Sequence, residues 1–141
     1  MNPFQSLRDY ETFVYTLLQS FPQIVRSTLV VARRGRLYAE LSGELILASG
    51  HRLVVYERLT WDTGPLVIEG YSYEVWHGSE KLYWYDSQPH PGDPMLASTD
   101  PHHKHVPPDV KHHRIPAPDM SFTPPNLTFL IREIKTALLQ D

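Results

Sequence analysis

Three histidines and a lysine follow a proline within five positions, in the block Pro101-His102-His103-Lys104-His105. The ordinary pKa of histidine is close to neutrality, so a cluster of imidazoles can transfer protons, bind a metal ion or become charged near about pH 6. Six of the eight histidines of the chain lie at or after His90, and the first 88 residues contain only His51 and His77. The block is therefore the first candidate for a functional site.

RNA cleavage is one reaction that this block suits. A metal-free ribonuclease needs a base for the 2′-hydroxyl proton, an acid for the leaving 5′-oxygen and a cation for the charged phosphorane. Histidine supplies the first two groups, lysine holds the phosphate, and an aspartate can orient an imidazole. The predicted catalytic set is His102, His103, His105, Lys104, His90, Asp86 and Tyr73.

The charge of the chain gives limited support for RNA binding. A net charge of -3 lacks the basic excess that is typical of nucleic-acid-binding domains. Basic residues nevertheless gather locally, at 26–36 and again at 102–114. Tyrosines near the block can position a base by stacking. The predicted RNA contacts are Arg33, Arg34, Lys104 and Tyr85.

Metal binding is the alternative chemistry for the same block. The chain has no cysteine, so only nitrogen and oxygen ligands are available. His102 and His105 are separated by two residues, a spacing that can place two imidazoles on one ion. A third ligand can come from His90, His112, His113 or Asp86, and the predicted set is His102, His105 and His90. A divalent ion such as zinc would then be the cofactor, whereas the ribonuclease hypothesis requires none.

A third possibility is that the histidines have no catalytic or metal-binding role. In that case the block is a surface loop whose imidazoles bond to the backbone, or a non-catalytic module that docks a partner. His51 and His77, which lie beside turns without a neighbouring histidine, are expected to be structural.

The elements that must position the block follow from hydrophobic periodicity. Helical spacing predicts one helix near each end of the chain, the first ending before Pro22 and the second beginning near 124–126. Alternation predicts five antiparallel strands in a meander, at 25–33, 36–48, 51–60, 66–76 and 81–87, with a bulge or bend at Gly43. Residues 89–125 hold ten of the thirteen prolines and are expected to form an irregular or extended His/Pro-rich loop that contains at most one short edge strand. The expected fold is a single α+β domain over residues 1–141, a five-stranded antiparallel meander sheet flanked by an N-terminal and a C-terminal helix.

The run from Tyr71 to His105 resembles the toxin component of the TumE-like toxin–antitoxin family. Its matching pieces are the aromatic strand 71–76, the segment Trp84-Tyr85-Asp86-Ser87-Gln88-Pro89-His90 and the block 101–105. The resemblance extends over most of the chain beyond the first helix.

The resemblance implies a small prokaryotic toxin of a type II pair, with a cognate DNA-binding antitoxin encoded beside it and RNA as the target. It carries over no catalytic assignment, and it gives no role to His112 or His113. No apolar run approaches the ~18 residues of a membrane span, so a cytoplasmic protein without a membrane partner is expected.

Overall fold

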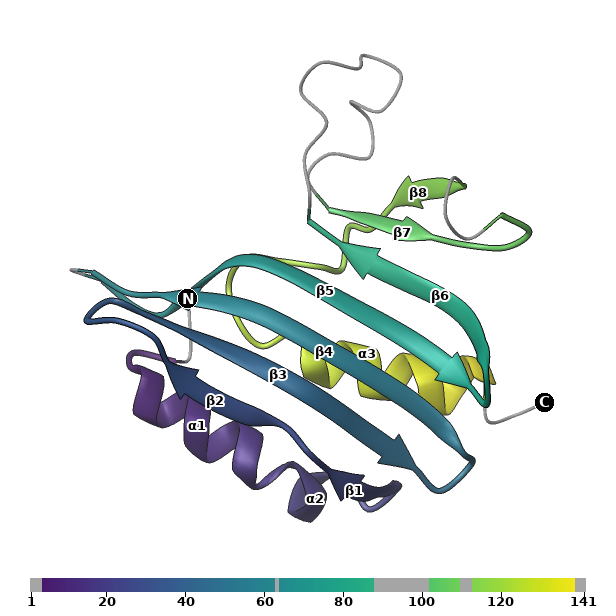
Figure 1. Ribbon diagram of the computed structural model, residues 1–141, viewed down its shortest axis with the longest axis horizontal. Helices are drawn as coiled ribbons and strands as arrows, with labels where there is room; N and C mark the ends of the chain where they lie inside the picture. The colour runs from purple at the N-terminus through teal and green to yellow at the C-terminus, as the bar shows by residue number, and fades with distance from the viewer. Residues whose placement is uncertain (1–3, 63, 88–101, 110–112, 139–141) are drawn as a thin grey trace.

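The computed structural model describes residues 4–62, 64–87, 102–109 and 113–138 (Figure 1). In this part of the chain, eight strands form one antiparallel sheet in the order β1-β3-β4-β5-β6-β7-β8, and β2 also pairs with β3. The strands are β1 (Ile24–Ser27), β2 (Val30–Arg33), β3 (Tyr38–Leu47), β4 (His51–Thr60), β5 (Val67–His77), β6 (Glu80–Asp86), β7 (His103–His105) and β8 (Arg114–Pro116).

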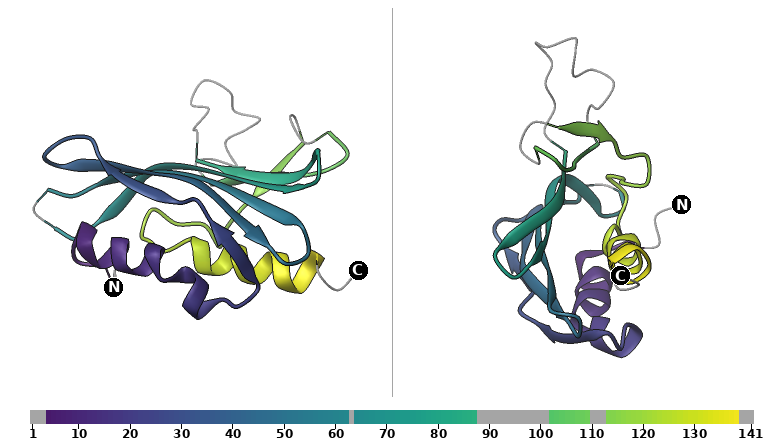
Figure 2. Two further views of the ribbon diagram at one scale, coloured as in Figure 1. Left: turned by 60° about the horizontal axis from the view of Figure 1, so that its bottom comes forward. Right: turned by 90° about the vertical axis from the view of Figure 1, so that its right-hand side faces the viewer.

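The helices lie together on one face of the sheet, as the two views of Figure 2 show. They are α1 (Leu7–Tyr15), α2 (Leu17–Ser20) and α3 (Leu127–Glu133), and α3 continues into the π-helical turn η2 (Ile134–Leu138). The hydrophobic core combines buried apolar side chains of α1, α2 and α3 with those of the strands, so it lies between the helices and this inner face. Within the described ranges, no helix lies on the opposite, outer face. No described helix has both the length and the apolar character needed to cross a membrane.

The central meander agrees with the predicted strand alternation. Strands β3 to β6 follow one another and pair in sequence order. Gly50 and Gly78 turn the chain with φ of 90° and 62°, which glycine adopts without a Cβ penalty. Alternate residues of β3, including Leu41 and Leu45, are fully buried on the inner face.

The prediction of five strands flanked by two helices was wrong, although the α+β class remains. The expected first strand divides into β1 and β2, which both pair with β3. The expected N-terminal helix also divides, at Thr16, whose hydroxyl donates to the Thr12 carbonyl at 2.7 Å.

The histidine block accounts for the other missed strands. Residues 103–105 form β7, which pairs with β6, and β8 pairs with β7 in turn. Proline lacks an amide donor, and Pro101 and Pro107 lie just outside this run, so its three residues can join a ladder. The described part of the proline-rich segment therefore adds two strands to the sheet, where an irregular or extended loop with at most one edge strand was expected.

Candidate functional site

Asp86 on β6 contacts two imidazoles of β7 on the outer face of the sheet. Its Oδ1 contacts Nε2 of His103, and its Oδ2 lies 3.2 Å from Nε2 of His105. The register explains the arrangement, because Asp86 is directly opposite His103 and the next residue but one of a strand returns to the same face. A carboxylate and two imidazoles thus converge, with their ligand atoms within 4.8 Å of one another.

Trp84 and Arg114 are neighbours of this cluster. The indole of Trp84 stacks on His105 with ring centroids 3.7 Å apart, and its Nε1 donates to Asp86 Oδ2 at 3.0 Å. Arg114 of β8 is opposite His105 in the ladder. His103 and His105 are buried, but the Asp86 side chain is 15% exposed. Burial lowers the pKa of His105, while the Asp86 carboxylate acts in the opposite direction.

Lys104 lies on the inner face, away from the two histidines that flank it. Its Nζ is 3.3 Å from Glu133 Oε2 on α3 and 4.3 Å from the ring centroid of Tyr83. The hydroxyl of Tyr85 donates to the same Glu133 carboxylate at 2.7 Å. The structure therefore separates Lys104 and Tyr85 from His103 and His105, although the sequence suggested a common site.

His102 is also outside the cluster. Its Nδ1 lies 2.7 Å from the Tyr71 hydroxyl, and its ring lies against Phe122, with centroids 4.5 Å apart. Burial is the main cause that lowers the pKa of His102, and the neighbouring His103 adds to it. Its imidazole therefore joins the aromatic contacts around Tyr71.

Tyr73, which was predicted to be catalytic, is fully buried in the core. Its hydroxyl donates to Glu57 Oε2 at 2.5 Å and accepts from Asn126 Nδ2 at 3.0 Å. The hydroxyl of Tyr10 donates to the other oxygen of Glu57 at 2.6 Å. Burial raises the pKa of Glu57 to about 7, against the lowering effect of the two tyrosine hydrogen bonds. This network joins α1, β4, β5 and the residue before α3.

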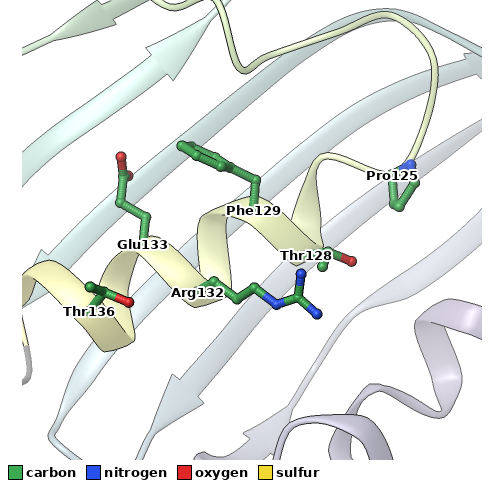
Figure 3. A pocket seen from close by; sticks show the side chains of 6 residues that line it. All are labelled: Pro125, Thr128, Phe129, Arg132, Glu133 and Thr136. Carbon is green, nitrogen blue, oxygen red and sulfur yellow. The ribbon is translucent and has the colours of Figure 1, made fainter.

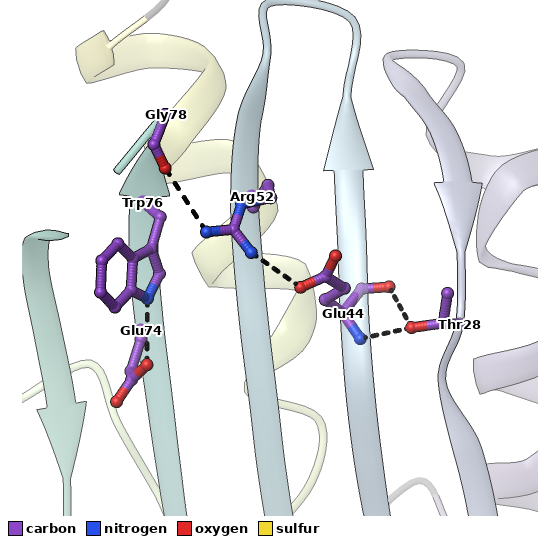
Figure 4. Close-up of polar contacts among 6 residues, drawn as sticks. All are labelled: Thr28, Glu44, Arg52, Glu74, Trp76 and Gly78. Atoms are coloured by element: carbon purple, nitrogen blue, oxygen red, sulfur yellow. Dashed lines mark hydrogen bonds and ion pairs between the residues drawn. The ribbon is translucent and has the colours of Figure 1, made fainter. Parts of the chain in front are cut away.

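The arginines predicted to contact RNA form surface ion pairs. Arg33 Nη2 is 3.0 Å from Glu11 Oε1, and Arg34 Nε is 3.0 Å from Glu40 Oε1. Figure 4 shows the same pairing farther along the sheet, where Arg52 Nη1 binds Glu44 Oε2 at 3.0 Å. These cations therefore have acidic partners in the free chain.

His90 and His112 lie outside the described residues. His113 has a local structural contact, because its Nδ1 lies 2.9 Å from the Pro107 carbonyl oxygen and its backbone bonds to Val106 and Asp109. These contacts hold His113, which precedes β8, against the residues that follow β7.

An open groove of about 670 Å³ runs along α3 on the helix side of the molecule. Figure 3 shows its lining residues: Pro125, Thr128, Phe129, Arg132, Glu133 and Thr136. None of them belongs to the predicted site. Glu133 connects the groove to Lys104 and Tyr85 through the contacts described above.

Sequence reasoning missed Trp84, Arg114 and Glu57 as functional or structural polar residues. Trp84 had a usable signal, because it lies two residues before Asp86 and so shares its face of a strand. Arg114 had none, since β8 was not predicted. Glu57 also had a usable signal, because it lies two residues from both Val55 and Leu59 and so shares the core face of β4 with them.

The comparisons with known proteins give one match. The family model described as Toxin TumE matches residues 14–138, which include both the cluster and its supporting strands. No curated protein and no solved structure matches the chain. Because the match extends over most of its length, the chain belongs to the TumE toxin family.

Proposed function

We propose that this protein is the toxin of a type II toxin–antitoxin pair, that it acts on RNA in the cytoplasm, and that Asp86, His103 and His105 form its active centre. The single observation that carries the proposal is the contact of the Asp86 carboxylate with both imidazoles. Membership of the toxin family supports a toxic activity and an antitoxin partner.

The chemistry of the cluster supports a phosphodiester substrate. Cleavage of RNA requires proton transfer at the 2′-hydroxyl and the leaving oxygen, and charge stabilisation at the phosphate. Imidazoles and a carboxylate can carry out the proton transfers. Arg114 lies beside His105 in the ladder and is a cation on the outer side of β8. It is better placed to stabilise charge at the phosphate than Lys104, which is bound to Glu133.

The cluster can act in two ways. One imidazole in its neutral form can serve as the general base and the other in its protonated form as the general acid, with Asp86 orienting both. Alternatively, the same three side chains can hold a metal ion that activates water. Both mechanisms make Asp86 essential, so replacing Asp86 should lower the activity in either case.

The antitoxin partner is proposed to be a DNA-binding protein encoded beside the toxin gene. Co-expression of the neighbouring open reading frame with this chain should restore growth and yield a complex that elutes as one species in size-exclusion chromatography. Growth that stays inhibited, without a complex, would remove that neighbour as the antitoxin.

The direct test is induction of the chain without its partner. We expect growth arrest together with new RNA 5′ ends in cells, and cleavage of single-stranded RNA but not DNA by the purified chain. Unimpaired growth at confirmed expression of folded protein would contradict the toxin proposal. Growth arrest with intact RNA would instead contradict the RNA target.

Two variants connect the activity to the cluster. Asp86→Asn keeps the size of the side chain and removes its charge, so the cleavage rate should fall by about 10²-fold or more. His77→Ala is the matched control, because His77 is exposed beside the turn of the β5–β6 hairpin, whereas Asp86 lies at the open end of that hairpin. Equal activity of Asp86→Asn and the parent chain, at equal melting temperature, would place the active centre elsewhere.

A further inference from the structure

We propose that Asp86, His103 and His105 bind one divalent transition-metal ion on the outer face of the sheet. The proposal rests on the geometry of the three side chains and does not depend on RNA as the substrate. It keeps His105 from the set of His102, His105 and His90 suggested by sequence spacing, but not His102, which lies on the other side of β7 against Tyr71. His90 lies outside the described residues.

The donor set is the first argument. Two imidazole nitrogens and one carboxylate oxygen, without a thiolate, suit borderline ions such as zinc, manganese, iron, cobalt or nickel. The nitrogens are the Nε2 atoms of His103 and His105, and each contacts a different oxygen of Asp86. The three side chains therefore bring their ligand atoms into one small region.

The spacing is the second argument. Ligand atoms around a tetrahedral zinc ion at ~2.0–2.1 Å are separated by about 3.4 Å. The three candidate ligand atoms already lie within 4.8 Å of one another, and Nε2 of His105 is 3.2 Å from Asp86 Oδ2. The separation of His105 Nε2 and Asp86 Oδ2 is thus already close to that of two ligand atoms on one ion.

The support around the ligands is the third argument. Metal-binding carboxylates are usually oriented by a further hydrogen bond. The Trp84 indole donates such a bond to Asp86 Oδ2, and the same ring covers His105. Two of the ligands lie on one short strand and the third on its neighbour, so the sheet ladder fixes their separation.

Access to the site is the fourth argument. Both imidazoles are buried, whereas Asp86 keeps part of its surface exposed. The carboxylate is therefore the part of the cluster that solvent reaches. Three protein ligands would leave at least one position for water or a phosphate oxygen, which is the arrangement of a catalytic rather than a structural site.

The test measures metal binding by the full-length, untagged chain. The protein is treated with chelator, dialysed, and titrated separately with Zn²⁺, Mn²⁺, Co²⁺ and Ni²⁺ by calorimetry, and elemental analysis gives the stoichiometry. We expect one ion per chain, with visible d–d absorption for Co²⁺. Affinity should fall at least about tenfold in Asp86→Asn and in His105→Ala. Binding should weaken as pH falls, because the ligands become protonated.

Matched histidine variants control for adventitious binding. His102→Ala removes an imidazole of the same block from the other face, and His77→Ala removes one from the stacked pair that His77 forms with His51. Both should retain the ion. Circular dichroism of each metal-free variant checks the fold, and the isosteric Asp86→Asn keeps the test decisive if His105→Ala fails to fold.

Failure of this proposal is distinct from failure of the proposed function. Absence of binding for all four ions in folded protein overturns the metal site. So does binding that survives Asp86→Asn, or that depends on His102 or His77. These results say nothing about toxicity, because none of the measurements involves RNA or growth. A chain that binds the ion but leaves RNA intact would keep the metal site and contradict the RNA target.

Discussion

Lys104 and His105 are consecutive in the chain, but their side chains lie on opposite faces of the sheet. Lys104 contacts Glu133 of α3 on the inner face, and His105 contacts Asp86 on the outer face. The cause is the period of two in a strand, which sends neighbouring side chains in opposite directions. Residues that are contiguous in the histidine block therefore belong to two separate sites in the folded chain.

The Lys104–Glu133 pair should contribute measurable stability. Both side chains are about one-fifth exposed, so solvent screens their interaction less than that of a surface pair. A double-mutant cycle of Lys104→Met and Glu133→Gln, followed by urea unfolding, should give a coupling free energy of about 0.5–1 kcal/mol. The more exposed Arg58–Glu69 pair is the control and should couple more weakly. Additive effects of Lys104→Met and Glu133→Gln would show that their contact has no energetic value.

Glu57 should make stability fall as pH rises from about 4.5 to about 7. Burial raises the pKa of this carboxyl in the folded state to about 7, from an ordinary value of 4.5. Between these values the folded chain holds a proton that the unfolded chain has released, so unfolding is favoured as pH rises. Above about 7 both states are ionised and the contribution stays lost. The predicted loss is on the order of 3 kcal/mol.

Comparison with Glu57→Gln isolates this contribution, because glutamine does not titrate. The difference in unfolding free energy between the parent chain and the variant should change between pH 5 and pH 8. Glu69→Gln, on the surface in the Arg58 pair, is the control and should show little change. A pH-independent difference for Glu57→Gln would mean that the buried carboxyl keeps an ordinary pKa.

Tyr73→Phe should destabilise the protein by about 1–2 kcal/mol. The substitution keeps the ring but removes the hydroxyl that donates to Glu57 and accepts from Asn126. Both partners are buried and would each lose a hydrogen bond. Tyr15→Phe, at an exposed position where one hydroxyl accepts from the Val31 amide, should cost less. Urea unfolding compares the two, and an unchanged midpoint for Tyr73→Phe would show that the network adds nothing to stability.

Gly43→Ala should destabilise the sheet by about 2 kcal/mol or more. Gly43 has φ of 129°, and a Cβ there would lie 2.5 Å from the backbone oxygen of Thr28, where β1 ends and β2 has not begun. A backbone atom cannot move aside as a flexible side chain can. Gly64→Ala, where a Cβ meets nothing within 4 Å, is the control and should change stability by less than about 0.5 kcal/mol. Equal unfolding midpoints for the two variants would contradict the close approach.

Local patterns predicted the family and the middle of the fold correctly. The pieces around 71–76, 84–90 and 101–105 gave the TumE resemblance that the family model confirms. The alternation of apolar residues predicted a meander that β3 to β6 form, and glycines with positive φ, Gly50 and Gly78, make two of its turns. These features depend on residues close together in the chain, so hydrophobic period and turn chemistry were sufficient.

The strand character of the histidine block was decided by the tertiary structure. Three residues between prolines have too short a pattern to predict a strand, and they become one because the free edge of β6 supplies hydrogen-bond partners. The same pairing brings Asp86 opposite His103, 17 positions later in the chain, and sends Lys104 to Glu133. Residue types and spacing alone therefore determined which side chains were available for chemistry. Their division between the two faces required the register of β6 and β7, because a shift of one residue moves every side chain to the other face.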